Sequence, residues 1–302
     1  MRVFAEGKRL RPRTEKVIIE GMKEKKKLSR KQIIAVITVA IAVPMIILWA
    51  GIAYISVNSV EGAGAWEDVG TRFVAHRGYS ALYFDNTTQA FEAAAKESFF
   101  QGIETDVRMT SDGVFVCSHD DNPFLDKSVS VAASTYDEIK NLPLDTSGSV
   151  HDADKSVDYR ICTLQEFLLQ CSVSRKTAFI EIKQDFDEEE IVELVTLVNK
   201  YLSYRKVVYC GFDKDVIGRL YRAYPYYTVQ LFTSSRVKAF FYTRMGYNIA
   251  VRSDAFTVAA LERAHKAECY YAVYTVNDPE LIKKLVSEGA DYVITDTVSD
   301  LA

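Results

Sequence analysis

A run of 23 residues without a single charge, 33–55, constrains this 302-residue chain more than any other feature. As a helix rising about 1.5 Å per residue, it would be about 34 Å long, enough to cross a hydrocarbon layer of about 30 Å. Pro44 lies within the run, and a membrane helix tolerates proline when neighbouring groups satisfy the freed backbone. The run therefore predicts one transmembrane helix over residues 33–55.

Charge is distributed unevenly along the chain. Residues 1–32 hold 12 Lys and Arg against 4 Asp and Glu, a net charge of +8, whereas residues 33–302 carry −12, so that the total is only −4. Basic residues mark the cytoplasmic side of a membrane span. We therefore predict a single-pass cell membrane protein with a basic cytoplasmic tail over 1–32 and an extracytoplasmic C-terminal body. The acidic body argues against nucleic acid as a partner.

Two other interpretations of the apolar run remain open. A buried core helix is disfavoured, because an uncharged stretch of this length with basic residues on one side is typical of a membrane segment. A cleaved signal peptide would fit the small residues Ala63-Gly64-Ala65, but the run is longer than the apolar region of such peptides. We favour a retained anchor, followed by a linker over 56–70.

Beyond the linker, residues 71–302 alternate short β-branched or aromatic runs with amphipathic helical patterns. The predicted strands are Arg72–Ala75, Gly102–Val107, Thr177–Ile182, Lys206–Cys210, Thr228–Phe232, Ile249–Val251, Tyr271–Val276 and Tyr292–Thr295. The predicted helices are Thr87–Ser98, Glu188–Tyr201, Asp213–Tyr224, Val258–Lys266 and Pro279–Ser287. Such alternation predicts an α/β fold, a closed TIM-type (β/α)8 barrel in one domain.

Two features interrupt this alternation. Ser111-Asp112-Gly113 followed by residues 114–118 predicts a hairpin that extends the second strand. Residues 120–160 are polar and irregular, with one predicted helix over Thr135–Asn141. We expect this small insertion after strand 2 to lie at the barrel mouth, because long loops of barrels commonly serve the active site.

Acidic residues recur at the ends of the early strands. Glu104 and Asp106 are two residues apart, so both side chains project to one side of their strand. Glu181 and Lys183 repeat this spacing on the next predicted barrel strand. Three inward carboxylates favour a hard divalent cation, Ca²⁺ or Mg²⁺, over zinc. We therefore predict one divalent metal ion bound by Glu104, Asp106 and Glu181.

Two histidines and an arginine stand near these carboxylates in the predicted fold. His76 and Arg77 follow the first strand, and His119 follows the hairpin. Histidines in this position are candidates for a general acid and a general base. Arg77 and Lys183 supply positive charge for a phosphate. Each residue alone has an ordinary structural explanation, such as a surface ion pair. Together at strand ends they predict metal-assisted phosphoryl chemistry.

Further motifs continue the pattern through the body. They are Ala75-His76-Arg77-Gly78, Asp85-Asn86-Thr87, Gly102–Val107, Thr110–Gly113 with His119-Asp120, Glu181-Ile182-Lys183, Tyr274–Asn277 and Gly289–Asp296. In this order they resemble the glycerophosphodiester phosphodiesterase family, in its bacterial membrane-anchored form, over nearly all of residues 71–302. The resemblance implies a TIM-type barrel that hydrolyses a phosphodiester to an alcohol and sn-glycerol 3-phosphate.

The resemblance also implies roles for individual residues. His76 and His119 would be the acid–base pair, Glu104, Asp106 and Glu181 the metal ligands, and Arg77 and Lys183 the phosphate-binding residues. Two departures bear on substrate choice. Asp85 stands where the family usually has Glu, and Tyr274 stands where it usually has Trp in the aromatic wall of the substrate pocket.

Competing functions stay open at this point. One is a phospholipase D-like enzyme or cyclising lyase that acts on lysophospholipids. A non-catalytic binding protein is less favoured, because both histidines and all three carboxylates are present. The expected partners are a small glycerophosphodiester or lysophospholipid and the membrane. The sequence does not define the alcohol, the choice of Ca²⁺ or Mg²⁺, the role of each histidine or the oligomeric state.

Overall fold

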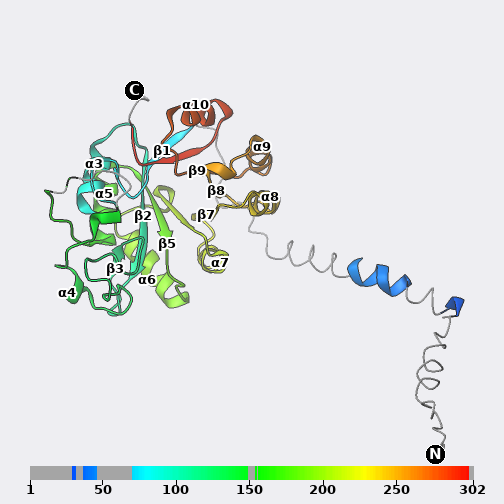
Figure 1. The fold of residues 1–302 in the computed structure, drawn as a ribbon, viewed down its shortest axis with the longest axis horizontal. Helices are drawn as coiled ribbons and strands as arrows, with labels where there is room; N and C mark the ends of the chain where they lie inside the picture. Colours follow the sequence, from blue (N-terminus) through cyan, green and yellow to red (C-terminus); the bar gives the residue numbers. More distant parts are fainter. Residues whose placement is uncertain (1–28, 32–36, 46–69, 149–153, 155, 299–302) are drawn as a thin grey trace, which may run out of the picture. The chain divides into compact units, whose positions relative to one another are not determined.

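The structure is a computed structural model that describes residues 29–31, 37–45, 70–148, 154 and 156–298 (Figure 1). The chain divides between Val57 and Asn58 into two units.

The first unit contains a helix over residues 37–45. Its apolar side chains are solvent-exposed; Val39 and Ile41, for example, are 59% and 57% accessible. Within the described ranges no helix is both long and apolar enough to cross a bilayer. The predicted membrane span over 33–55 is described only in part, because 33–36 and 46–55 lie outside those ranges, as do nearly all of the predicted tail and linker.

The second unit is a barrel of eight parallel strands (Figure 1). The strands are β1 (Arg72–Ala75), β2 (Gly102–Met109), β5 (Thr177–Ile182), β6 (Val207–Gly211), β7 (Thr228–Thr233), β8 (Ile249–Arg252), β9 (Tyr271–Tyr274) and β10 (Tyr292–Thr295). Each pairs with the next, and β1 pairs with both β10 and β2, which closes the sheet. The predicted TIM-type barrel is confirmed, with strand bounds within two residues of the expected ones.

Helices cover the outside of the barrel. They are α3 (Thr88–Lys96), α5 (Leu164–Ser174), α6 (Glu188–Asn199), α7 (Lys214–Ala223), α8 (Arg236–Arg244), α9 (Val258–Lys266) and α10 (Pro279–Glu288). Helix α10 begins as its sequence predicts: the Asp278 side chain accepts a hydrogen bond from the Leu281 backbone N–H, and Pro279 opens the first turn. Helices α5 and α8 were not among the predicted ones.

Strand alternation sorts side chains between two apolar cores. On β2, Ile103 and Val107 pack outward against the helices, so Glu104 and Asp106 point into the barrel. The interior below these acids is filled by a second apolar cluster, which contains Val74, Phe179, Val208, Cys210, Phe232, Ala250, Ala272, Tyr292 and Ile294. The acids therefore lie above an apolar plug, at the carboxyl ends of the strands.

The insertion begins with the predicted hairpin. Strand β3 (Phe115–Cys117) pairs antiparallel with the end of β2, and β4 (Cys162–Thr163) pairs with β3. Helix α4 (Tyr136–Ile139) is shorter than the predicted one, and a 3₁₀ turn follows over Thr146–Gly148. The insertion has a small core of its own, formed by Val116, Phe124, Val131, Ile139, Leu144, Tyr159 and Ile161. The hairpin is thus confirmed, and it extends β2 beyond the barrel.

Gly78 fixes the turn that leads from β1 to α3, and its replacement by alanine is expected to destabilise the barrel. Its φ of +84° disfavours a side chain, and an added Cβ would lie 2.7 Å from the backbone of Ala90 in α3. Together these effects are expected to lower the free energy of unfolding by about 2 to 4 kcal/mol. Urea denaturation of Gly78→Ala measures this loss.

Gly113→Ala is the matched control, because Gly113 has a φ of +82° but no atom within 4 Å of the added Cβ. It is expected to lose only about 1 kcal/mol from the unfavourable φ. Equal losses in the two variants would show that contact with Ala90 is not what requires glycine at position 78.

Candidate active site

Three carboxyl groups meet at the barrel mouth. Glu104 and Asp106 come from β2 and Glu181 from β5, and Asp106 and Glu181 are direct register partners. The three side chains are almost completely buried, and one oxygen of each lies within 4.8 Å of the others. The structure therefore brings together the three acids that the sequence singled out.

Burial and mutual repulsion act strongly on these acids. Burial raises the pKa of Glu104 well above its usual value, and the charges of Asp106 and Glu181 raise it further. Burial and Asp106 likewise raise the pKa of Glu181 to about 7. Burial works in the same direction on Asp106, but Arg77 and Lys183 outweigh it and hold the pKa of Asp106 below its usual range. Asp106 is therefore the permanently ionised member.

Two cations are held against the acids. Arg77 Nε lies 3.0 Å from Asp106 Oδ2, and Lys183 Nζ lies 3.2 Å from Asp106 Oδ1 and 2.7 Å from Glu181 Oε1. The Arg77 backbone N–H donates to Glu104 Oε2 at 2.8 Å. Arg77 has a φ of 56°, an uncommon conformation for a residue with a side chain. Local backbone strain thus accompanies the placing of a cation beside the carboxylates.

The acidic group fits a divalent cation. Were all three carboxyl groups ionised, they and the two cations would sum to −1, a charge that repels a phosphodiester anion. Glu104 Oε1 is buried and accepts no hydrogen bond from any described residue, as expected of an oxygen that serves as a metal ligand. Hard carboxylate oxygens suit Ca²⁺ or Mg²⁺. The group of Glu104, Asp106 and Glu181 can therefore hold a metal ion.

His76 follows β1 directly and is oriented from the far end of the chain. Its Nδ1 lies 2.7 Å from Asp296 Oδ1, and Asp296 follows β10, the strand that pairs with β1. Asp296 is buried and also accepts from Ser80 Oγ at 2.9 Å and Asn277 Nδ2 at 2.6 Å. The contact with Asp296 fixes the orientation of the His76 ring and leaves Nε2 as the ring nitrogen that can exchange a proton. Asp296 was not predicted as a site residue, although it stands where a barrel strand ends.

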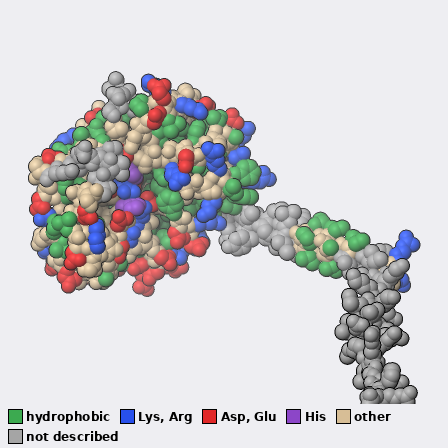
Figure 2. Space-filling model, in the orientation of Figure 1, with side chains coloured by type: hydrophobic (Ala, Val, Ile, Leu, Met, Phe, Trp, Pro, Cys, Tyr) green, Lys and Arg blue, Asp and Glu red, His purple; other side chains and the backbone are tan. Residues whose placement is uncertain are grey.

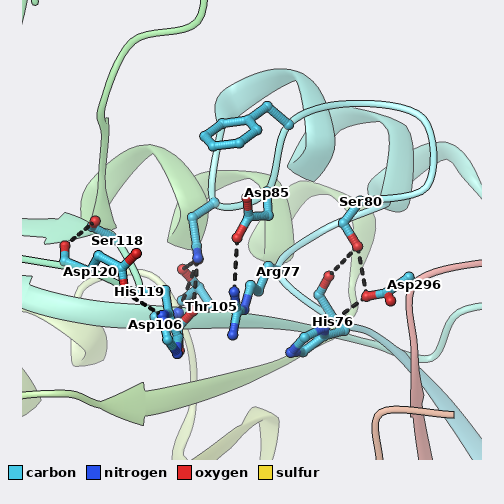
Figure 3. A network of polar contacts seen from close by, with 12 residues as sticks. His76, Arg77, Ser80, Asp85, Thr105, Asp106, Ser118, His119, Asp120 and Asp296 are labelled. Atoms are coloured by element: carbon cyan, nitrogen blue, oxygen red, sulfur yellow. Dashed lines mark hydrogen bonds and ion pairs between the residues drawn. The ribbon is translucent and has the colours of Figure 1, made fainter. Parts of the chain in front are cut away.

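His119 is carried by the hairpin instead of a barrel strand. Its Nδ1 lies 2.8 Å from Asp120 Oδ1, and Arg108 Nη2 donates to its backbone carbonyl at 2.9 Å. Burial lowers the pKa of His119 below 6.5, although Asp106 acts in the opposite direction. The neutral ring therefore predominates at pH 7. Figure 3 shows His76 and His119 on opposite sides of Arg77.

Asn86 links the loop after β1 to β2. Its Nδ2 donates to Asp106 Oδ2 at 2.8 Å, and its Oδ1 accepts from the Asp106 backbone N–H at 3.0 Å and from Thr105 Oγ1 at 2.9 Å. Arg77 Nη1 is in turn held by Asp85 Oδ2 at 3.0 Å. Asn86 thus orients Asp106, one of the three acids that can hold a metal ion, a role that its position in a polar loop does not reveal.

A cavity of about 200 Å³ opens beside the acid group. Arg77 and His119 line it together with the loop after β1 and the insertion, through Phe84, Asp85, Asn86, Cys117, Ser118, Asp120, Pro123, Lys127, Leu144, Asp145 and Ser147. The insertion therefore lies at the barrel mouth, as expected. Tyr274 lies at the end of β9 and does not line this cavity; its ring stacks on Phe232 with centroids 5.0 Å apart.

A closed (β/α)8 barrel with buried acids, two cations and two histidines at its mouth defines a class of enzyme that acts on phosphate esters. Comparison with known families agrees: residues 76–300 match the Glycerophosphoryl diester phosphodiesterase family. The match covers most of the chain, so the chain belongs to this family. Its enzymatic activity is that of a glycerophosphodiester phosphodiesterase.

Individual relatives are similar to this chain over about three quarters of its length. A Bacillus altitudinis glycerophosphodiester phosphodiesterase is 26% identical over 241 residues, which cover 75% of this chain and 94% of that protein. An uncharacterized Bacillus subtilis protein is 29% identical over 237 residues, which cover 75% of this chain and 95% of that protein. The crystal structure of a Thermotoga maritima glycerophosphodiester phosphodiesterase superimposes with a TM-score of 0.58 at 27% identity, covering 75% of this chain and 94% of that chain.

Asp296→Asn is expected to lower kcat about 10-fold to 100-fold with KM nearly unchanged, because the amide can present its N–H to His76 and select the wrong tautomer. Steady-state kinetics and the pH profile of kcat measure the effect. Ser80→Ala is the control, since it removes one hydrogen bond to Asp296 but keeps the carboxylate. Unchanged kcat and pH profile in Asp296→Asn would show that this contact does not position His76.

Proposed function

We propose that the protein hydrolyses glycerophosphodiesters to an alcohol and sn-glycerol 3-phosphate in a reaction that depends on a divalent metal ion. The observation that carries this proposal is the buried group of Glu104, Asp106 and Glu181, with cations and histidines beside it. A phosphodiesterase from Oleispira antarctica, whose barrel superimposes with a TM-score of 0.63 at 20% identity over 74% of this chain and 92% of that chain, was solved with the product sn-glycerol-3-phosphate. Its bound product supports the choice of substrate class.

The metal would be held by Glu104, Asp106 and Glu181, and it would supply positive charge that stabilises the phosphate oxygens in the transition state. Together with a divalent ion, the three ionised carboxylates, Arg77 and Lys183 would have a summed formal charge of +1, which favours an anionic substrate. Arg77 and Lys183 then orient the phosphodiester from two sides. Either Ca²⁺ or Mg²⁺ suits these oxygen ligands.

The two histidines would divide the proton transfers. His119 is neutral at pH 7 because burial lowers its pKa, so it accepts the proton of the attacking hydroxyl. His76, held through Nδ1 by Asp296, donates a proton from Nε2 to the departing alkoxide. The nucleophile is water or the neighbouring glycerol hydroxyl, and the latter forms a cyclic phosphate before hydrolysis.

We further propose that residues 33–55 anchor the protein in the cell membrane, with residues 1–32 in the cytoplasm and the barrel outside. The length of the uncharged run and the 12 basic residues before it support this orientation. The described part of the run, residues 37–45, is helical and exposes its apolar side chains. Such a surface is compatible with a lipid environment.

An assay of the purified chain against glycerophosphocholine, glycerophosphoethanolamine and glycerophosphoglycerol tests the activity. We expect release of sn-glycerol 3-phosphate, its loss with EDTA, and recovery on addition of Ca²⁺ or Mg²⁺. Phosphorus NMR distinguishes the products. Cyclic phosphate as the lasting product would instead identify a lyase, and activity on lysophospholipids alone would identify the phospholipase-like alternative. Full activity after thorough chelation would overturn the metal dependence.

His119→Ala is expected to lower kcat by about 100-fold or more, which is typical for loss of a general base. In the unaltered enzyme, the acidic limb of the kcat/KM profile should lie below pH 6.5, since protonation of His119 abolishes its basicity and its pKa is lowered. That limb should vanish from the residual activity of His119→Ala. Near-normal turnover in His119→Ala would show that His119 is not the general base.

A further inference from the structure

Helix α8 presents an unusual surface. Val237, Phe240 and Phe241 point outward and are 66%, 42% and 48% exposed, whereas the small Ala239 and the polar Thr243 are buried beneath the helix. An ordinary surface helix has its large apolar residues inward and its polar residues outward. In Figure 2, hydrophobic side chains with basic ones beside them are visible at the edge of the barrel where Figure 1 places α8.

Basic residues surround these apolar side chains. Helices α8 and α9, which pack together, carry five Lys and Arg but only one acidic residue, in a chain whose residues 33–302 have a net charge of −12. The five are Arg236, Lys238, Arg244, Arg263 and Lys266. Among the described residues none of these five forms a salt bridge with a carboxylate. Arg236 donates to the Asp254 backbone carbonyl and Arg263 lies over the Phe240 ring, but no described carboxylate is within ion-pair distance of any of the five, so their positive charges remain for an external anion.

Arg263 of α9 connects the exposed aromatic side chains of α8 with the surrounding basic residues. Its guanidinium lies over the Phe240 ring, 4.5 Å from the centroid, and the Phe240 and Phe241 rings meet edge to face at 5.4 Å. Exposed aromatic side chains with basic side chains beside them suit the boundary between acyl chains and anionic headgroups, where rings enter the apolar layer and long basic side chains reach the phosphates.

We propose that the outer face of α8, with the adjoining basic residues of α9, is a docking surface for an anionic phospholipid bilayer. This inference rests on the proposed membrane anchor: the predicted linker over 56–70 has 15 residues, which would span about 50 Å if fully extended, so an anchored barrel could reach the bilayer. Helix α8 starts just after β7, at the end of the barrel where the active site lies. Docking would therefore hold the barrel mouth beside the lipid surface that supplies its headgroup-derived substrates.

Site-directed spin labelling of the full chain in vesicles tests the proposal. Cysteine is introduced at Phe241, or at Val192 as the control, because both residues are 48% exposed and Val192 lies on the acidic helix α6. The five native cysteines are buried, so the nitroxide label reports the chosen site. Vesicles contain phosphatidylcholine with or without phosphatidylglycerol, and collisions of the label with oxygen and with a water-soluble nickel complex report its depth.

In the anionic vesicles, the label at position 241 is expected to collide more often with oxygen, which enters the acyl layer, than with the nickel complex, which stays in water. The label at position 192 is not expected to show this difference. Lys238→Glu with Arg244→Glu should reverse the difference at position 241, since each removed basic charge weakens the attraction about five-fold. Lys96→Glu with Lys200→Glu changes the net charge equally and should have no effect. Turnover of a soluble glycerophosphodiester should be unchanged in all these variants.

Other outcomes overturn the inference in distinguishable ways. If the chain floats with vesicles while the label at 241 stays aqueous, the anchor holds but α8 does not dock. If the chain does not float, both the anchor and the docking surface are wrong, while phosphodiesterase activity in solution is unaffected. Spin–spin broadening at position 241 without lipid contact would show that the face binds a second copy of the chain.

Discussion

Like charges packed into an apolar barrel are the constraint on which this structure depends. Glu104, Asp106 and Glu181 lie within 4.8 Å of one another above an apolar interior, and each buried charge costs several kcal/mol unless it is paired. Arg77 and Lys183 provide the pairing, and Asn86 provides hydrogen bonds. The loop after β1 carries Arg77 to these acids with an uncommon φ of 56°, and the next residue, Gly78, packs closely on Ala90 of α3.

Much of the barrel and part of the site follow from local patterns in the sequence. The alternation of Ile103, Glu104, Thr105 and Asp106 sorts these side chains by strand geometry alone, so their inward direction is predictable. Asp296 is different. It lies 220 residues from His76, and only closure of the barrel between β1 and β10 makes them neighbours. Asn86 likewise acquires its role through a contact that no spacing encodes.

The two helices absent from the predictions have different explanations. Helix α5 buries Leu164, Phe167, Leu168 and Cys171, a helical spacing that is present in the sequence but follows directly on an irregular insertion. Helix α8 lacks such a pattern, because Phe240 and Phe241 face outward while Ala239 and Thr243 face inward. The outer face of α8 therefore departs from the usual rule that large apolar residues are buried. Departures of this kind are expected where residues serve a function other than folding.

The position of His119 has a consequence for the way such enzymes diverge. The carboxylates, both cations and His76 stand on barrel strands or directly after them, whereas His119 follows the hairpin strand β3 and opens the insertion. The insertion has its own small core and forms one wall of the cavity. It can therefore accumulate substitutions, insertions and deletions with little effect on the barrel. One wall of the cavity and the buried carboxylates thus lie on separable pieces of the chain, and the two can diverge at different rates.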